Sequence, residues 1–272
     1  MIMKRYLLIF PIITALFLMT LSSCKKNAVV NITKPYAGAQ FKYYNFAINA
    51  PSVNFFANGT KTAATLSATG LESPTGTLYG SLVPVMGYSL SPTGTVVFKA
   101  ITPSTMPLNA AIGQGPSIEV ASVTKDVVEG KNYSFYTSGI YDYATNKSDA
   151  FILEDALPAP DTSIAYIRLV NPGHNTSTLS LELTQTLTSV PPGGPSLVII
   201  TTPITDIVYK TASAYIPIKQ GSYTLRLIDA ASGKIVARGA TSLFKESVYT
   251  FTLRGNLITG VPAAFLDFTE NR

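Results

Sequence analysis

Short runs of alternating residues fill most of this 272-residue chain, and turn-forming residues separate them. In the run at 222–230, SYTLRLIDA, the side chains of Tyr223, Leu225 and Leu227 fall on one side of an extended strand. Gly, Pro, Asn and Ser bound the runs, and no long helical pattern follows residue 38. The other runs are FKYYNFAI (41–48), SVNFFANG (52–59), GTVVFKAIT (94–102), NYSFYTSGIY (132–141), IAYIRLVN (164–171), LSLELTQT (179–186), SLVIITT (196–202) and SVYTFTLRG (247–255). The pattern predicts an all-β fold of short strands.

The composition favours the same fold class and argues against a nucleic-acid partner. Charged residues make up 13% of the chain, below the roughly 25% usual for globular domains. Aromatic residues are Tyr (15) and Phe (13), without Trp, and such residues suit a pleated, half-buried surface. The net charge is +5, and it falls to +3 without residues 1–23, which hold Lys4 and Arg5. Because the remaining positive charges form no run of five, we expect no nucleic-acid partner.

The N-terminus has the layout of a secretory signal peptide over residues 1–23. Lys4 and Arg5 precede an apolar run at 6–21, and two small serines follow it. The alternative is a transmembrane helix, which needs roughly 20 apolar residues. This run is shorter and contains Pro11. The sequence therefore favours a signal peptide.

The only cysteine, Cys24, follows directly in the stretch LSSC. This stretch resembles the lipobox of bacterial lipoproteins, although Ser23 stands where Gly or Ala is commoner. The resemblance implies a lipid on Cys24, cleavage just before it, and a membrane partner through that lipid. The alternative, an ordinary buried cysteine, is less favoured because residue 24 lies between the signal peptide and a tether at 24–38. A single cysteine also excludes an intramolecular disulfide framework.

The resemblance also bears on localisation. We expect an outer-membrane protein. In Bacteroidetes-type lipoproteins, acidic residues soon after the cysteine favour export to the cell surface. Lys25 and Lys26 stand there instead, so the periplasmic face is favoured slightly over the cell surface.

Weak internal similarity predicts two tandem modules, 39–157 and 161–272. FKYYN ending at Asn45 matches IRLVN ending at Asn171, and Tyr88 with Gly94 matches Tyr215 with Gly221. GKNYSFYTSGI near 130 resembles KESVYTFTLRGNLI near 245 at a shorter offset, which predicts extra residues at 102–118 in the first copy. The proline-rich ALPAPD at 156–161 marks the boundary. The alternative is one large sandwich with chance similarity among Tyr- and Thr-rich strands.

These landmarks resemble the bacterial domain-of-unknown-function family numbered 4397. The positions that match its motifs are 168–171, 53–59, 215–224 and 130–133. Lys42 replaces the motif's Arg in the first copy, and the second copy lacks the Asn-Gly turn. The resemblance implies two immunoglobulin-like antiparallel β-sandwiches in a cell-envelope protein. It implies no activity.

Candidate catalytic and metal-binding residues are few, and we expect no catalytic site, metal or cofactor. The only histidine, His174, lies in the turn-like stretch NPGHNTS, where an exposed loop residue is the simplest interpretation. One histidine and a lipidated cysteine do not make a zinc site. The acidic region 142–155 fits no calcium loop, and we expect a solvated loop and strand end. The glycine-rich PPGGPS at 191–196 lacks the lysine and the helix of a phosphate loop.

The expected function is therefore a non-enzymatic envelope protein that binds or scaffolds through sandwich loops and exposed tyrosines. The tyrosine-rich stretches 41–46 and 132–143 are candidate binding surfaces, although such residues are more often core. The partner would be a glycan or an envelope protein. Alternatives are a glycan-binding accessory of a polysaccharide-uptake system, a pilus or adhesin subunit, and a hydrolase with an unrecognised carboxylate pair.

Overall fold

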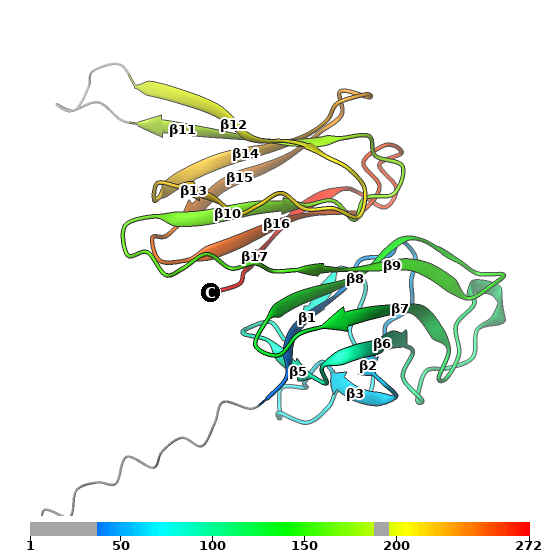
Figure 1. The fold of residues 1–272 in the computed structure, drawn as a ribbon. Helices are drawn as coiled ribbons and strands as arrows, with labels where there is room; N and C mark the ends of the chain where they lie inside the picture. Colours follow the sequence, from blue (N-terminus) through cyan, green and yellow to red (C-terminus); the bar gives the residue numbers. More distant parts are fainter. Residues whose placement is uncertain (1–36, 188–195) are drawn as a thin grey trace, which may run out of the picture. The chain divides into compact units, whose positions relative to one another are not determined.

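The computed structural model describes residues 37–187 and 196–272, so the predicted signal peptide, Cys24 and most of the tether lie outside the described residues. Gly38–Arg272 form one compact unit (Figure 1). Its described residues are all-β, as predicted, with four sheets and one short 3-10 helix at Ala110–Ile112. Within the described ranges, no helix is long and apolar enough to cross a membrane.

The first two sheets form what we call the N-terminal sheet pair. One sheet has the order β4-β1-β8-β9, with β5 also paired to β1, and the other has the order β3-β2-β6-β7. The strands are β1 (Ala39–Asn45), β2 (Asn54–Ala57), β3 (Thr60–Ala63), β4 (Ser81–Val83), β5 (Ser89–Ser91), β6 (Gly94–Ile101), β7 (Glu119–Val127), β8 (Asn132–Asp142) and β9 (Lys147–Glu154).

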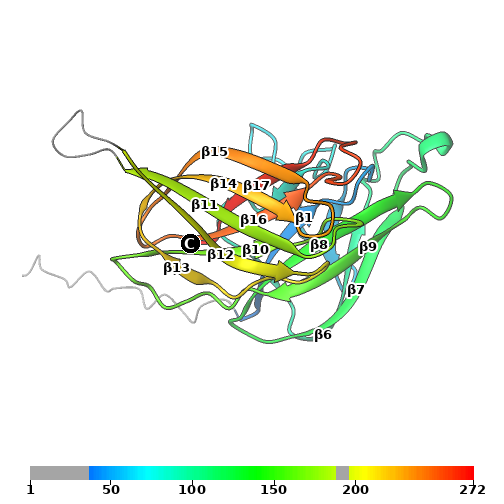
Figure 2. The ribbon, with the colours of Figure 1, turned by 90° about the horizontal axis from the view of Figure 1, so that it is seen from above.

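The other two sheets form the C-terminal sheet pair. Their strand orders are β13-β10-β16-β17 and β12-β11-β14-β15, and Figure 2 shows the strands of the second sheet side by side. The strands are β10 (Ala165–Val170), β11 (Leu179–Leu187), β12 (Leu197–Ile207), β13 (Ile216–Ile218), β14 (Gly221–Asp229), β15 (Ile235–Leu243), β16 (Val248–Arg254) and β17 (Phe265–Glu270).

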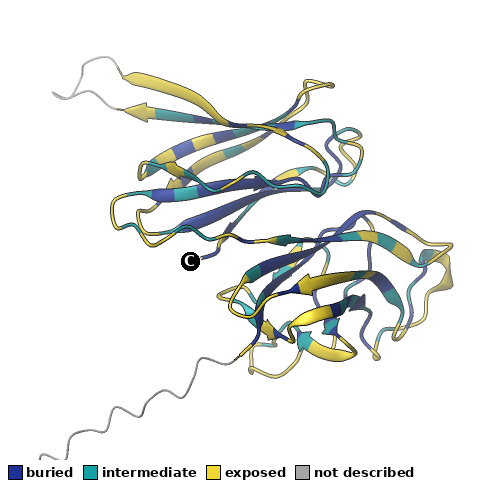
Figure 3. Cartoon of the chain, viewed as in Figure 1, coloured by how far each residue is buried: buried dark blue, intermediate teal, exposed yellow. Residues whose placement is uncertain are grey.

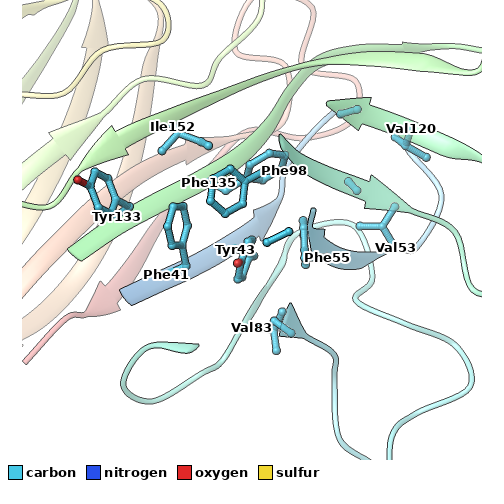
Figure 4. Packing of buried hydrophobic residues seen from close by; sticks show 14 of the residues in the cluster. Phe41, Tyr43, Val53, Phe55, Val83, Phe98, Val120, Tyr133, Phe135 and Ile152 are labelled. Carbon is cyan, nitrogen blue, oxygen red and sulfur yellow. The ribbon is translucent and has the colours of Figure 1, made fainter. Parts of the chain in front are cut away.

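Each sheet pair encloses its own apolar core (Figure 3). The first core is aromatic: Phe41 stacks on Phe98 with ring centroids 4.4 Å apart, and Tyr43 stacks on Phe55 at 4.8 Å (Figure 4). The second core is mainly aliphatic, with Leu181, Leu183, Leu225 and Leu227 all buried between its sheets. Burial of alternate residues on facing strands explains both cores, since a strand places every second side chain on one face.

The prediction of purely antiparallel sheets is wrong at one place in each sheet pair. β1 pairs with β8 in parallel, with Tyr43 opposite Phe135, and β10 pairs with β16 in parallel, with Leu169 opposite Phe251. Parallel strands need a long connection, and here nearly a whole module of chain lies between the two partners. Alternation along single strands does not reveal which distant strand becomes a neighbour.

Several local predictions are confirmed. All nine runs named from the sequence contain strands. Asn58 and Gly59, both with positive φ, form the tight turn between β2 and β3, as the Asn-Gly pair predicts. The extra residues of the first copy also lie where expected, because 102–118 connect β6 to β7 whereas only 230–234 connect β14 to β15. The stretch 156–161 contains no strand, and its role as a module boundary stays a prediction.

Candidate functional site: a buried polar cluster

Eight polar side chains from both sheet pairs meet in the interior, and we call them the buried polar cluster. Four of them lie in strands whose other faces line the two apolar cores, so alternation along each strand directs them away from those cores. The other four lie just before or just after a strand. The members are Lys42 (β1), Tyr88, Ser134 (β8) and Asp155 (after β9), and Arg168 (β10), Tyr215, Thr250 (β16) and Asn271 (after β17).

An ion pair between Asp155 and Arg168 lies at the centre of the cluster. Arg168 Nη2 donates to Asp155 Oδ1 at 2.5 Å, and both side chains are almost fully buried, at 0% and 2% exposed. The second carboxylate oxygen of Asp155 accepts from Ser134 Oγ at 2.7 Å and from the Tyr88 hydroxyl at 3.1 Å. A buried ion pair is tolerated only where further hydrogen bonds satisfy it, and this one meets that condition.

A chain of hydrogen bonds continues from the Arg168 guanidinium to the opposite side of the cluster. Arg168 Nε donates to Thr250 Oγ1 at 2.9 Å, and Thr250 Oγ1 donates to Asn271 Oδ1 at 2.6 Å. Asn271 Nδ2 then donates to the Tyr88 hydroxyl at 2.9 Å, which closes a ring back to Asp155. The ring joins residues of both sheet pairs, so neither pair can move away without breaking several buried bonds.

Lys42 brings a second positive charge into the cluster. Its Nζ donates to the backbone carbonyl of Glu270 at 2.8 Å and lies 5.3 Å from the centroid of the Tyr88 ring. Burial lowers the pKa of Lys42 to about 8, although the charges of Asp155 and Glu270 partly oppose that effect. Burial raises the pKa of the Tyr88 hydroxyl, and the neighbouring Asp155 charge raises it further.

The two halves of the cluster come from equivalent positions of the internal repeat. Lys42 corresponds to Arg168 and Tyr88 corresponds to Tyr215, at the offsets found in the sequence. Each cation lies over its own tyrosine and donates to a carbonyl of the other sheet pair: Lys42 to Glu270, and Arg168 Nη1 to Glu154 at 3.5 Å. Ser134 and Thr250 are likewise equivalent, as are Asp155 and Asn271. The repeat landmarks therefore mark an internal contact.

An apolar patch next to the cluster completes this contact. Tyr44, Tyr136 and Phe151 of the N-terminal sheet pair pack together with Val170 of the C-terminal pair. The rings of Tyr44 and Tyr136 stack at 4.3 Å. Neither hydroxyl has a hydrogen-bond partner in the described part of the chain, which is unusual for a buried polar atom.

The chemistry open to the cluster is limited by its enclosure. A general acid or base has to lie within hydrogen-bonding reach of its substrate. Lys42, Asp155 and Arg168 are all buried and already bound to protein atoms. The arrangement fixes the two sheet pairs together through bonds between protein atoms.

The structure corrects part of the prediction for the acidic region. Asp142, Asp149 and Glu154 are solvent-exposed, and Glu154 pairs with Lys131 at 2.8 Å, as a solvated segment would. Asp155 is instead buried and paired with Arg168, so the expectation of a solvated strand end is wrong for this residue. The one sequence signal was the repeat, in which Asn271 stands at the same place in the second copy, but this equivalence does not predict burial.

The tyrosine-rich stretches are largely buried. Tyr43, Tyr44, Tyr133 and Tyr136 are at most 2% exposed, so the prediction that such residues are more often core is confirmed, and these four rings are not among the exposed tyrosines of the expected binding role. Only Tyr143 in these stretches is exposed, at 40%. Alternation places these residues either in the first core or at the internal contact, and both faces of β1 and β8 are buried.

His174 lies in a turn, as predicted, although it is half-buried rather than exposed. Among the described residues, no group of three or more His, Cys, Asp or Glu side chains is placed to hold a metal ion. A hollow of about 560 Å³ opens beside β17 and is lined by Leu82, Val85, Met86 and Phe268 among others. Val85 and Met86 are highly exposed there. Glu270 and Asn271 also line the hollow, so it borders the buried polar cluster.

Comparison with known proteins gives little beyond the fold class. No family model matches the chain, and no curated protein matches it. The resemblance to the domain-of-unknown-function family 4397 is therefore supported by its motif residues alone. Those residues do coincide with the internal contact, since Arg168 of the first motif belongs to the buried polar cluster.

Two solved structures resemble the chain distantly. A candidate cell adhesion protein from Bacteroides ovatus is 9% identical, with a TM-score of 0.25, and the match covers 88% of this chain and 97% of that one. The tip fimbrial protein Mfa3 of Porphyromonas gingivalis, truncated at its C-terminus, is also 9% identical, with a TM-score of 0.27 and coverage of 85% and 98%. At such TM-scores the likeness carries no functional assignment.

Proposed function

We propose that this chain is a cell-envelope lipoprotein with a non-enzymatic role in binding or scaffolding. It would consist of two immunoglobulin-like β-sandwich modules behind a lipidated tether. The observation that carries the proposal is the buried polar cluster, in which Arg168, Asp155 and Asn271 tie the two sheet pairs together. A body fixed in this way presents its outer surface in a constant geometry, as a scaffold requires.

The state of the ionisable groups supports a role without catalysis. Perturbed pKa values often mark active sites, but structural ion pairs perturb them too. Here Lys42 and Tyr88, whose pKa values are strongly shifted, are enclosed and bonded to protein atoms. Turnover of a substrate that a single Asp or Glu substitution abolishes, with the fold intact, would contradict this part of the proposal.

The membrane attachment would depend on Cys24, which lies outside the described residues. Cells fed a labelled fatty acid should incorporate label into the wild-type chain, and the chain should fractionate with the outer membrane. The variant Cys24→Ser should lose both the label and the membrane fraction. Label retained in the variant would contradict lipidation at this residue. Resistance of the wild type to protease added to intact cells would support the periplasmic face.

The binding role can be tested with the soluble chain from Lys25 to the C-terminus. Immobilised chain should retain an envelope protein or a glycan from solubilised cell envelopes. The matched control is Arg168→Gln, which should loosen the internal contact and weaken retention while leaving the exposed residues unchanged. Retention of a polysaccharide would favour the glycan-binding alternative, and retention of fimbrial subunits would favour the pilus or adhesin alternative. Equal, negligible retention by both chains would contradict the proposal.

A further inference from the structure

The sheet β12-β11-β14-β15 ends in an unusual edge strand, β12. This strand pairs with β11 on one side, and on its other side the described residues provide no backbone partner for 197–203. All of these residues are exposed, as Figure 3 shows in yellow. They include Leu197 (59% exposed), Val198 (54%) and Ile200 (61%).

Long, apolar and exposed edge strands invite pairing with another chain, and proteins usually protect them. The equivalent edge of the N-terminal sheet pair is protected. There β3 has only four residues, Thr60–Ala63, and carries Lys61, which forms an ion pair with Glu72 from the following loop. In contrast, β12 has 11 residues and no lysine along its length. The same chain therefore shields the β3 edge along its length, whereas β12 is interrupted only beyond Thr201, by Pro203 and by register shifts against β11.

The flank beside β12 is also open, and its apolar side chains are interspersed with Gln185, Thr201 and Lys219. A hollow of about 190 Å³ lies there, lined by Leu183, Ile199, Ile218 and Tyr223 among others. Ile199 belongs to β12 and Ile218 to β13, which is the edge strand of the facing sheet. A further strand added beside β12 would extend the sheet and cover this flank with its inward side chains.

We propose that β12 pairs antiparallel with β12 of a second copy of this chain. The charge pattern permits this occupant. Residues 197–205, LVIITTPIT, carry no charge, and like charges directly opposite each other destabilise a strand pair. A charge-free strand can therefore lie against its own copy without repulsion. Antiparallel pairing of identical strands gives a closed twofold dimer, the commonest symmetry of oligomers.

The geometry limits the pairing to 197–203. This run spans roughly 23 Å at about 3.3 Å per residue, a normal length for a strand. Pro203 ends it, because proline has no N–H to donate to a new ladder. Ile200 stands in the middle of the run, so the Ile200 side chains of the two copies would be neighbours across the twofold axis.

Sedimentation of the soluble chain from Lys25 to the C-terminus tests the pairing through its oligomeric state. The wild-type chain should form dimers that dissociate on dilution. Ile200→Lys and Ile200→Glu should each raise the dimer Kd by more than about tenfold, because like charges would face each other. An equimolar mixture of the two variants should dimerise again, since Lys then faces Glu. Ile235→Lys, at an exposed position on the opposite edge strand β15, should leave the dimer Kd unchanged.

Three results would overturn the pairing. One is a wild-type chain that stays monomeric at high concentration, and another is an Ile200→Lys variant that dimerises as well as the wild type. The third is loss of dimers when residues 25–37 are deleted and β12 is intact, which would make the tether the occupant of the edge. Thermal melting of each variant checks that the fold is kept. Failure of the pairing would leave lipidation at Cys24 and the proposed function untouched.

Discussion

At the scale of single residues, Asp155 and Arg168 depend on each other more than any other charged pair described. Both are buried, and the carboxylate accepts three hydrogen bonds. The variant Asp155→Asn keeps the shape of the side chain but leaves the guanidinium without its counter-charge. We expect it to lower the free energy of unfolding by about 3–5 kcal/mol. Urea denaturation of the chain from Lys25 to the C-terminus measures this loss.

The matched control is Asp149→Asn. Asp149 is exposed on β9 and pairs with Lys210. Removal of its charge should therefore lower the free energy of unfolding by only about 0–1 kcal/mol. Equal losses for the two variants would show that Asp155 is solvated and that the cluster does not form.

Lys42 makes the stability of the chain depend on pH in an uncommon direction. Its pKa is lowered to about 8 by burial, while in the unfolded chain the pKa has its ordinary value of 10.5. Between these values the unfolded chain binds more protons than the folded chain, so the free energy of unfolding rises with pH. We expect the free energy of unfolding of the wild type to rise by about 2 kcal/mol between pH 8 and 10, relative to that of a Lys42→Met variant measured alongside it.

The comparison is limited to pH 10 for a physical reason. Burial raises the pKa of Tyr88 in the folded chain, so ionisation of tyrosines in the unfolded chain favours unfolding above pH 10. A wild type and a Lys42→Met variant with parallel pH profiles from 8 to 10 would show that Lys42 keeps an ordinary pKa.

At the scale of secondary-structure elements, the β2–β3 turn isolates the effect of backbone conformation. Gly59 has φ +81°, and no other part of the protein lies within 4 Å of where a Cβ would stand, so only the dihedral angle opposes a side chain there. We expect Gly59→Ala to cost about 1–2 kcal/mol in the free energy of unfolding. Gly239→Ala is the control, because Gly239 also has open space but lies in β15 without a positive φ. It should be neutral or slightly stabilising, and equal costs would contradict the turn conformation.

The sequence predicted strands best where apolar alternation was strong. It found the central strands β1, β8, β10 and β14, whose alternating side chains fill the cores. It missed edge strands such as β15, IVARGATSL, because half of an edge strand faces solvent and the apolar signal is weak. Parallel pairing was missed because register between distant strands is set by packing and not by local pattern.

Only part of the buried polar cluster could be predicted from the sequence. The repeat aligned Lys42 with Arg168 and Tyr88 with Tyr215, but alignment does not say that equivalent residues of two copies contact each other. Asp155 was grouped with acidic neighbours that are solvated. Its burial follows from the strand end meeting the second sheet pair, which is a tertiary effect that no local composition records.

At the scale of the whole molecule, the cluster makes the two sheet pairs interdependent. Each pair has its own apolar core, which is the usual requirement for a domain that folds alone. Yet the polar residues at the internal contact are satisfied only when both pairs are present, since Arg168 needs Asp155 and Lys42 needs the Glu270 carbonyl. Unfolding one pair would break the ion pair and hydrogen bonds that cross the contact and expose the apolar side chains packed there, so the energy of the contact couples the two cores.

This coupling predicts one cooperative unfolding transition for the chain from Lys25 to the C-terminus, with equal calorimetric and van't Hoff enthalpies. Arg168→Gln removes the guanidinium at the contact and should separate the melt into two transitions. Leu225→Ala is the control, because it opens a cavity in the C-terminal core alone and costs a similar amount, about 2–5 kcal/mol. It should lower the melting temperature while keeping a single transition. If Arg168→Gln melts in a single transition, or the wild type melts in two, the cluster does not couple the unfolding of the two sheet pairs.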